Sequence, residues 1–318
     1  MSKLRDVLRG GDLKTFRWDE SQNEAWREET DRLRTMSHMA ASYKRLDMLE
    51  YLFDRKMLEM SSKDAWGMTV LSCCVAPQGL NFVDEAARSH RRTSKEIAKD
   101  DLESVKMLKW LHEKGLVDAN LEDTSGATLA FTAAAFELVD TLDWLQNHGL
   151  LQPWSTKHSS GNIAFFCARY GLLRPLQWMY EQEEELKDAK ETKKRDGLLK
   201  ELKKPNPKNG IHLVHYAASS GHLDLLKWLH FKNIDDIQAV DVNGNNVATY
   251  AARELRIDVI TWLHHLRLLP MLIRHRNDLS NAVSSERFGY MRYMSLQGME
   301  KSAWKKKCKM DAHANTTM

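Results

Sequence analysis

The sequence predicts an all-α solenoid of about six helix-turn-helix repeats, with two insertions and a basic C-terminal extension. Three observations predict it. An aromatic residue followed by Leu or Met recurs at a regular interval, small residues precede it by ten positions, and a glycine opens most units. Self-similarity at a period of about 20–50 residues is the signature of stacked repeats, which bury a continuous core only by packing on one another.

The aromatic residue sets the length of the unit. Its copies are Trp110, Trp144, Trp178, Trp228 and Trp262, and Tyr51 takes the same place before the first of them. The steps from Trp110 to Trp144, from Trp144 to Trp178 and from Trp228 to Trp262 are equal, which makes one step the length of a unit. The steps from Tyr51 to Trp110 and from Trp178 to Trp228 are longer. The sequence therefore predicts one insertion in each of these two intervals.

The residues around each aromatic predict two short antiparallel helices per unit. The small residues ten positions before it are Ala41, Ala134, Ala168, Ala218 and Ala252. They make the first helix thin on one face, so that neighbouring helices can approach closely. The second helix, such as "LDLLKWL", has the wide apolar stripe of a helix packed on both sides, which predicts that the tryptophans lie in the core. Tight turns before each unit are predicted at Gly67, Gly126, Gly210 and Gly244.

One unit resembles a known family. The segment "NGIHLVHYAASSGHLDLLKWLHFKN" is similar to an ankyrin repeat, because six of its residues fall on the family's G-x-T-P-L-H-x-A-A-x-x-G-H positions. They are Gly210, His215, Ala217, Ala218, Gly221 and His222. Thr69 and Thr128 keep the Thr of that motif in other units, and no unit keeps the Pro. Tryptophan in the second helix is similar to ankyrin arrays of protists and giant viruses. The resemblance implies that His215 ties neighbouring units together by hydrogen bonds.

The repeats predict three parts of the chain. Residues 1–34 form an N-terminal extension, residues 35–268 the ankyrin-like array, and residues 269–318 a C-terminal cap and basic tail. Within the array, an insertion at about 77–101 interrupts the second unit and reads as a loop with a short helix. A second insertion, at about 184–208, has acidic residues first and basic residues later, which is typical of a solvated helix.

Composition excludes several classes of protein. Apolar residues make up 42% and charged residues 29%, with a net charge of +3, which is too mild to demand nucleic acid or a membrane surface. The four cysteines, Cys73, Cys74, Cys167 and Cys308, have neither zinc spacing nor a disulfide framework. No stretch approaches the roughly 20 apolar residues of a membrane span. We expect a cytoplasmic protein, with the nucleus as the alternative.

Catalytic motifs are absent from the sequence. It contains no P-loop, dinucleotide-binding, zinc-protease or serine-hydrolase signature. Histidines recur near the ends of the second helices, as at His112 and His230, where they suit the terminal carbonyls and the helix dipole. We therefore expect no enzyme, no cofactor and no metal site.

The resemblance implies where a protein partner would bind. Ankyrin-like arrays bind through a concave face, made of the hairpin tips and the exposed side of the first helices. The position before the small pair points there, and it holds Met39, Cys73, Thr132, Phe166, Tyr216 and Tyr250. The tips would present Trp66, Asp123, His158 and Asp241. Three aromatic rings in consecutive units predict the centre of a protein-binding groove, because large aromatics are frequent in binding hot spots. The alternative is that the rings pack against the preceding hairpin.

The C-terminal tail is the other candidate contact. Residues 267–309 hold ten Lys or Arg against three acidic residues. The cluster at its end consists of Lys301, Trp304, Lys305, Lys306, Lys307 and Lys309. Such a tail either keeps the chain soluble or docks on an acidic partner or nucleic acid, with Trp304 as the anchoring ring. We thus predict a non-enzymatic protein-binding module or scaffold. The alternatives are a structural subunit of a large assembly, docking by insertions and tail, and a nucleic-acid-associated protein.

Overall fold

Pairs of short helices build the part of the chain that can be described. The computed structural model describes residues 34–76, 92–151, 162–187, 203–254 and 256–268. These residues contain helices and two isolated β-bridges, with no strand among them, so the predicted all-α class is confirmed. The hairpins are α3 (Met36–Ser42) with α4 (Leu46–Asp54), α5 (Val70–Val75) with α7 (Ser94–Glu113), α8 (Leu129–Ala135) with α9 (Val139–Asn147), α10 (Ile163–Tyr170) with α11 (Leu173–Lys187), α13 (Leu213–Ser220) with α14 (Leu223–Phe231), and α15 (Val247–Arg253) with α16 (Ile257–His265).

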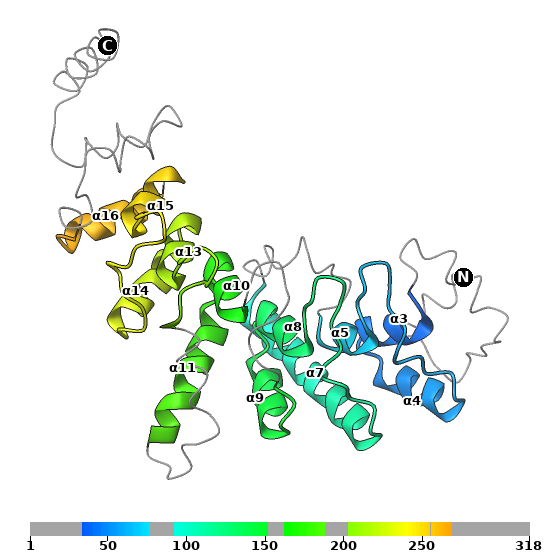
Figure 1. Ribbon diagram of the computed structural model, residues 1–318. Coiled ribbons are helices and arrows are strands. Elements are labelled where there is room, and N and C mark those ends of the chain that lie inside the picture. Colours follow the sequence, from blue (N-terminus) through cyan, green and yellow to red (C-terminus); the bar gives the residue numbers. More distant parts are fainter. Residues whose placement is uncertain (1–33, 77–91, 152–161, 188–202, 255, 269–318) are drawn as a thin grey trace, which may run out of the picture. The chain divides into compact units, whose positions relative to one another are not determined.

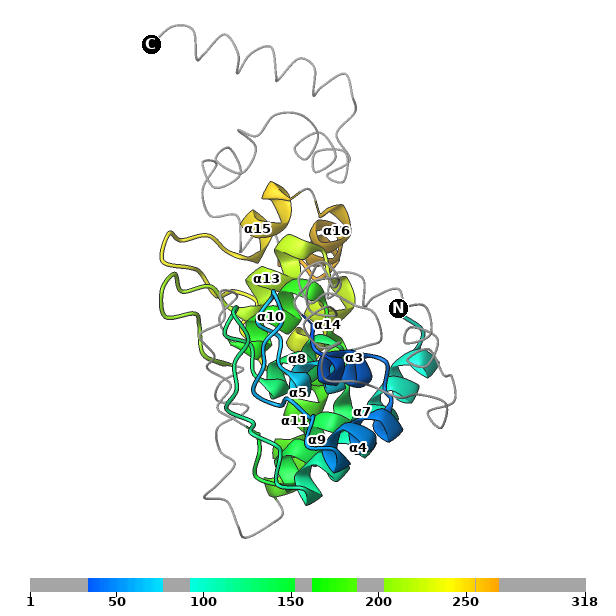
Figure 2. The ribbon, with the colours of Figure 1, turned by 90° about the vertical axis from the view of Figure 1, so that its right-hand side faces the viewer.

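The chain divides into two compact units. Unit 1 contains residues 1–167 and 174–181, and unit 2 contains residues 168–173 and 182–318. In unit 1 the first helices α3, α5 and α8 form one row and the second helices α4, α7 and α9 form another (Figures 1 and 2). In unit 2 the first helices α13 and α15 pack on each other, and each packs on its own second helix, α14 and α16. We call the first helix of each hairpin the inner helix and the second the outer helix.

A polar side chain starts each of five inner helices. In the N-cap position the side chains of Thr35, Thr69, Thr128 and Asn246 accept a hydrogen bond from the backbone N–H three residues later. Asn162 does the same for the N–H of Phe165 before α10. Such caps satisfy one of the N–H groups that the first turn of a helix leaves without a partner. The Thr that survives from the ankyrin-like motif is therefore the residue that fixes where the inner helix begins.

The small residues of the inner helices lie in the core, as predicted. Ala40, Ala41, Ala133, Ala134, Ala217 and Ala218 are all fully buried. Because their side chains add little width, adjacent inner helices can pack backbone against backbone. The outer helices close the core from the other side with larger residues, such as Leu108 and Leu111 of α7.

The tryptophans lie less deep than the sequence predicted. Trp144 and Trp178 are 6% and 5% exposed, while Trp110, Trp228 and Trp262 are only half-buried. In the outer helices of the last three, other apolar residues are the fully buried ones, such as Leu108 and Leu111 of α7. The prediction that every tryptophan is a core residue is therefore wrong for three of the five.

A ring from the preceding outer helix covers each of three tryptophans. The residue two positions after the aromatic of one repeat meets the tryptophan of the next edge-on, with ring centroids 5.6–5.8 Å apart. The pairs are Phe53 with Trp110, His112 with Trp144, and His230 with Trp262. Edge-to-face rings attract through their quadrupoles. His112 and His230 thus have the structural role predicted for them, but through ring packing rather than through helix carbonyls.

Five outer helices end on a left-handed residue in equivalent positions. Lys56, Gly115, Gly149, Asn233 and Arg267 have φ angles of 59°, 68°, 66°, 51° and 57°. In each case the next N–H donates to a carbonyl five residues back, as Leu150 does to Leu145 at 2.8 Å. This is the Schellman arrangement, in which the residue after the left-handed position is commonly apolar and packs back on the helix. Here that residue is Met57, Leu116, Leu150, Ile234 or Leu268.

The two long helices overlap the predicted insertions. Residues 94–101, assigned to the first insertion, are the first two turns of α7, which continues as the outer helix of its repeat. Thr93 caps α7 and its N–H donates a hydrogen bond to the Glu96 carboxylate, which completes a capping box. α11 likewise runs into the predicted second insertion as far as Lys187. Within the described residues, no helix has the length and apolar character needed to cross a membrane.

Candidate partner-binding surface

The loops that lead from one helix pair to the next inner helix, whose tips we call fingertips, share one turn built around an aspartate. In the sequences Asp64 to Gly67, Asp123 to Gly126 and Asp241 to Gly244, the Asp Oδ1 accepts the N–H groups two and four residues later at 2.8–3.0 Å. The Gly N–H donates back to the Asp carbonyl, with the Gly at positive φ. An Asp that bonds its own following backbone stabilises a tight turn.

The carboxylate at the last of these fingertips is fully engaged. Asp241 is 6% exposed, and its Oδ2 accepts hydrogen bonds from Tyr250 Oη at 2.8 Å and Asn245 Nδ2 at 2.9 Å. Burial and the Asp241 carboxylate together raise the pKa of Tyr250. Asp241 was predicted to face a partner. In the structure it holds the fingertip and orients Tyr250 instead. Asp123, the corresponding predicted residue in unit 1, caps its own turn and is half-buried.

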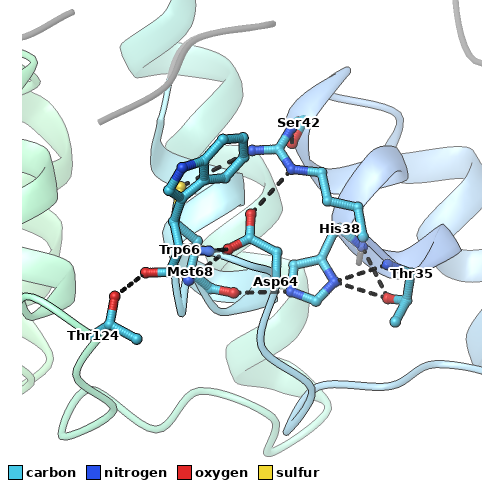
Figure 3. Close-up of polar contacts among 8 residues, drawn as sticks. Thr35, His38, Ser42, Asp64, Trp66, Met68 and Thr124 are labelled. Atoms are coloured by element: carbon cyan, nitrogen blue, oxygen red, sulfur yellow. Dashed lines mark hydrogen bonds and ion pairs between the residues drawn. The ribbon is translucent and has the colours of Figure 1, made fainter. Parts of the chain in front are cut away.

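Figure 3 shows the polar contacts of Asp64, Trp66 and Thr124 at the first two fingertips, where an arginine contacts Asp64. Arg34 Nε donates a hydrogen bond to Asp64 Oδ2 at 3.1 Å. In unit 2 the equivalent Oδ2 of Asp241 accepts a hydrogen bond from the Tyr250 hydroxyl instead. The Arg34 guanidinium also lies 5.5 Å from the centre of the Trp66 ring, within cation–π range. The Thr124 hydroxyl of the next fingertip donates to the Trp66 carbonyl. The half-buried Trp66, predicted to be a contact residue, is thus held on both sides by its own unit.

The row predicted to line the concave face differs between the units. Cys73, Thr132 and Phe166 are 1%, 1% and 4% exposed, so their expected exposure is wrong. Phe166 packs on Phe131, with ring centroids 4.8 Å apart, which is the packing given above as the alternative. In the repeats that contain these three residues the slot is therefore part of the core.

Three members of the row keep exposed area. Met39, Tyr216 and Tyr250 are half-buried. Tyr250 is fixed at its hydroxyl by Asp241, and the Arg253 guanidinium lies 5.9 Å from the centre of its ring. Arg253 in turn donates to Asn245 Oδ1 at 2.8 Å, which ties the inner helix to the fingertip. His158 and the residues of the basic tail cluster lie outside the described residues.

Two buried histidines join neighbouring repeats. His215 Nδ1 accepts the His212 N–H at 3.0 Å, so its other nitrogen, Nε2, carries the proton and donates to the Ala239 carbonyl at 3.0 Å. His38 repeats this arrangement, with Nδ1 beside Thr35 and Nε2 donating to the Met68 carbonyl at 2.9 Å. Burial lowers the pKa of both imidazoles, which keeps them neutral. The role predicted for His215 is confirmed.

A family model supports the same reading from the sequence. The model described as ankyrin repeats (many copies) matches residues 214–264, which contain α14, α15 and most of α13 and α16. The remaining hairpins share the N-cap, the buried small pair and the left-handed turns of that segment. Residues 214–264 are ankyrin repeats.

Other comparisons add no specific activity. No curated protein matches this chain. One similar structure is titled as the Bd0816 predatory endopeptidase from Bdellovibrio bacteriovorus in complex with immunity protein Bd3460, at 15% identity and a TM-score of 0.47, covering 73% of this chain and 98% of that one. Another is the ankyrin repeat domain of Bcl-3, described as a unique member of the IkappaB protein family, at 13% identity and 0.49, covering 79% and 98%.

Two ankyrin features escaped the sequence reasoning. Thr35 and His38 have the Thr-x-x-His spacing of the family motif, and the signal was hidden because the residues between them are Met and Ser. Asp64, Asp123 and Asp241 each precede a predicted turn glycine by three positions, and the part that their carboxylates take in the turn was not predicted. Among the described residues no group of three or more His, Cys, Asp or Glu side chains could hold a metal ion.

Buried charge marks the first two repeats. The Lys44 ammonium crosses from the first hairpin and donates to the Cys74 carbonyl and, at 3.0 Å, to Ser104 Oγ. Burial lowers the pKa of Lys44 to about 8 and raises that of the Cys74 thiol to about 12. The Cys73 and Cys167 thiols are also buried, and burial raises the pKa of each. Lys44 thus links the first two repeats, and the buried thiols offer no reactive thiolate.

Proposed function

We propose that this ankyrin chain is a non-enzymatic protein-binding module, and that unit 2 contacts its partner through the face of its inner helices. Ankyrin repeats generally mediate protein–protein interaction. One observation carries the choice of face. Tyr216 and Tyr250 occupy equivalent positions on consecutive inner helices and keep exposed area, whereas the same position in unit 1 is buried at Cys73 and Thr132.

The chemistry of this face supports protein recognition. Tyrosine and arginine are the residue types most enriched in binding hot spots, together with tryptophan. Tyr250 and Arg253 are held in place by Asp241 and Asn245, so a partner would find them already ordered. Ordering before binding reduces the entropy lost on association. The adjoining fingertip adds apolar surface at Val242, which is 70% exposed.

A photocrosslinking experiment tests the choice of face. A benzophenone amino acid placed at position 216 should capture a partner, and the same group at Lys227, exposed on the outer helix α14, serves as the matched control. Capture that is equal at both positions would contradict the proposal.

Affinity for the captured partner gives the second test. Tyr216→Ala should weaken binding by about 30-fold, since hot-spot rings contribute about 2 kcal/mol. Tyr216→Phe should lose less, because the ring remains. A variant that melts at lower temperature yet binds normally would assign Tyr216 to the core and remove this surface from consideration.

A further inference from the structure

A hydrogen bond between a histidine and a carboxylate fastens the segment after α14 to the start of α13. Asp235 lies in the loop between α14 and the last fingertip and is 7% exposed. Its Oδ1 accepts a hydrogen bond from His212 Nδ1 at 2.8 Å, and its Oδ2 accepts the Val214 N–H at 3.1 Å. The carboxylate therefore caps the amino end of α13 and pairs with the residue in the N-cap position.

Both partners of this pair depart from the pattern of the other repeats. Where α13 has His212, the other inner helices begin at Thr35, Thr69, Thr128, Asn162 and Asn246. Asp235 follows Trp228 by seven positions, and at that spacing the first three repeats have Leu58, Val117 and Leu151. In the first repeat the corresponding link is uncharged, since the Glu59 N–H donates to Ser37 Oγ at 3.0 Å. A neutral hydrogen bond links these segments in the first repeat, whereas an ionisable pair of side chains links them here.

We propose that His212 and Asp235 form a pH-sensitive latch on loop 233–240. The protonated imidazole holds the loop against α13, and loss of that proton loosens it. The loop leads directly into Asp241, which orients Tyr250, so the latch sets how firmly the last fingertip is held. The consequence for partner binding rests on the proposed function, whereas the latch itself does not.

The surroundings of His212 favour its charged form. The hydrogen bond to Asp235 raises the pKa of His212. Asp236 adds a second, exposed carboxylate, and its N–H donates to Asp235 Oδ1 at 2.9 Å. An imidazolium keeps the hydrogen bond and adds attraction to a carboxylate that is almost fully withdrawn from water.

The remaining titratable groups at this junction are already committed. The His215 ring lies 5.7 Å from that of His212, and its Nδ1 accepts the His212 N–H, so His215 is held neutral. On the far side of His215, Tyr250 donates to Asp241, and the Arg253 guanidinium lies over the Tyr250 ring. None of these can replace His212 as the cation facing Asp235.

The sign of the pH dependence follows from the direction of each pKa shift. A raised pKa in the folded state gives stabilisation that is complete below the unfolded value, about 6.5, and is lost as pH rises through the folded value. The latch is therefore strongest in mild acid. His38 and His215, whose pKa values are lowered, act oppositely, because their contribution declines as pH falls below about 6.5. The effect of the latch is therefore measured as the difference in pH dependence between wild type and a variant that lacks His212.

Hydrogen–deuterium exchange of loop 233–240, corrected for intrinsic rates between about pH 5.5 and 8.5, tests the latch. Wild type should lose several-fold of its protection in this loop as pH rises. His212→Thr, which restores the residue found at three other N-caps, should not show this loss of protection as pH rises. His265→Thr removes an exposed histidine from α16 of the same unit and should behave as wild type. A flat wild-type profile, or a His212→Thr profile equal to wild type, overturns the latch.

Asp235→Asn supplies the second arm. It keeps an acceptor oxygen and removes the charge, so its exchange profile should match that of His212→Thr, and the double variant should add nothing further. Additive effects would show that the two residues do not act as a pair. Exchange needs no partner, so the two tests are independent. If the exchange profile titrates and Tyr216→Ala leaves the affinity for the captured partner unchanged, the latch stands and the proposed binding surface does not. If the exchange profile does not titrate and Tyr216→Ala weakens binding, the binding surface stands and the latch does not.

Discussion

At the scale of single residues, burial rather than residue type decides what each landmark contributes. Trp178 is 5% exposed and Trp228 is half-buried, although both mark the same position of the repeat. Trp178→Ala should lower the free energy of unfolding by about 3–5 kcal/mol, the usual cost of truncating a core tryptophan. Trp228→Ala should cost clearly less, because part of its ring already contacts water. Urea denaturation of the two variants side by side measures the difference, and equal losses would contradict it.

Glycine is favoured at some left-handed positions by both its backbone conformation and the lack of space for a Cβ, and at others by its backbone conformation alone. A Cβ on Gly149, at φ 66°, would meet nothing within 4 Å, whereas a Cβ on Gly171, at φ 71°, would lie 2.5 Å from His222 Nδ1. Gly149→Ala should cost about 1–2 kcal/mol, the penalty of the left-handed conformation alone.

Gly171→Ala should cost more than Gly149→Ala, because His222 must also move away and give up its hydrogen bond to the Arg169 carbonyl at 3.0 Å. Thermal melts of the two variants, with Gly115→Ala as a second open position, provide the comparison. A Gly171 variant as stable as the Gly149 variant would show that the His222 ring moves without loss.

At the scale of helices, a side chain of one helix caps the amino end of another. The N-cap position of α9 is Leu138, which has no side-chain acceptor, and Asp101 of α7 supplies it from the neighbouring repeat. Its carboxylate accepts the N–H groups of Asp140 and Thr141 and the Thr141 hydroxyl at 2.6–2.9 Å. Burial raises the pKa of Asp101, so these bonds must offset the loss of hydration.

Asp101→Ala should therefore free the start of α9 and lower stability by about 1–3 kcal/mol, the cost of leaving buried donors without an acceptor. Amide exchange at residues 140 and 141 should rise before that of the rest of the helix. The neighbouring substitution Asp100→Ala is the control, since Asp100 does not contact α9 through any of these bonds. Unchanged amide exchange at the start of α9 would show that Asp101 does not stabilise this end of the helix.

The elements also show how far sequence could lead. Periodicity revealed the six hairpins, because small residues and tryptophans recur at one spacing whatever their exact depth. It could not separate buried Thr132 from half-buried Tyr216, because exposure at that position depends on which side chains of adjacent repeats pack over it. The Asp235 latch was equally hidden, since its two partners are distant in the sequence and neither belongs to a recurring motif.

At the scale of the whole molecule, stacked repeats tolerate additions between units better than changes within them. Each repeat contacts mainly its neighbours, so a segment between two repeats is not part of a shared core. Deletion of residues 188–202, which spares all of α11, should leave helical circular dichroism per residue and the melting temperature nearly intact. Loss of cooperative melting would show that the segment contributes to packing.

The buried cysteines allow local opening to be followed with a simple reagent. Cys73 and Cys74 lie in α5 of unit 1, and Cys167 lies in α10, where the two units meet in the sequence. Alkylation requires a thiolate in contact with solvent, and burial together with the raised pKa values leaves both conditions unmet in the folded chain. A maleimide would modify these thiols only during opening of the repeat that covers them. Mass spectrometry of the labelled sites would then time the opening of the second and fourth repeats separately, without any engineered probe.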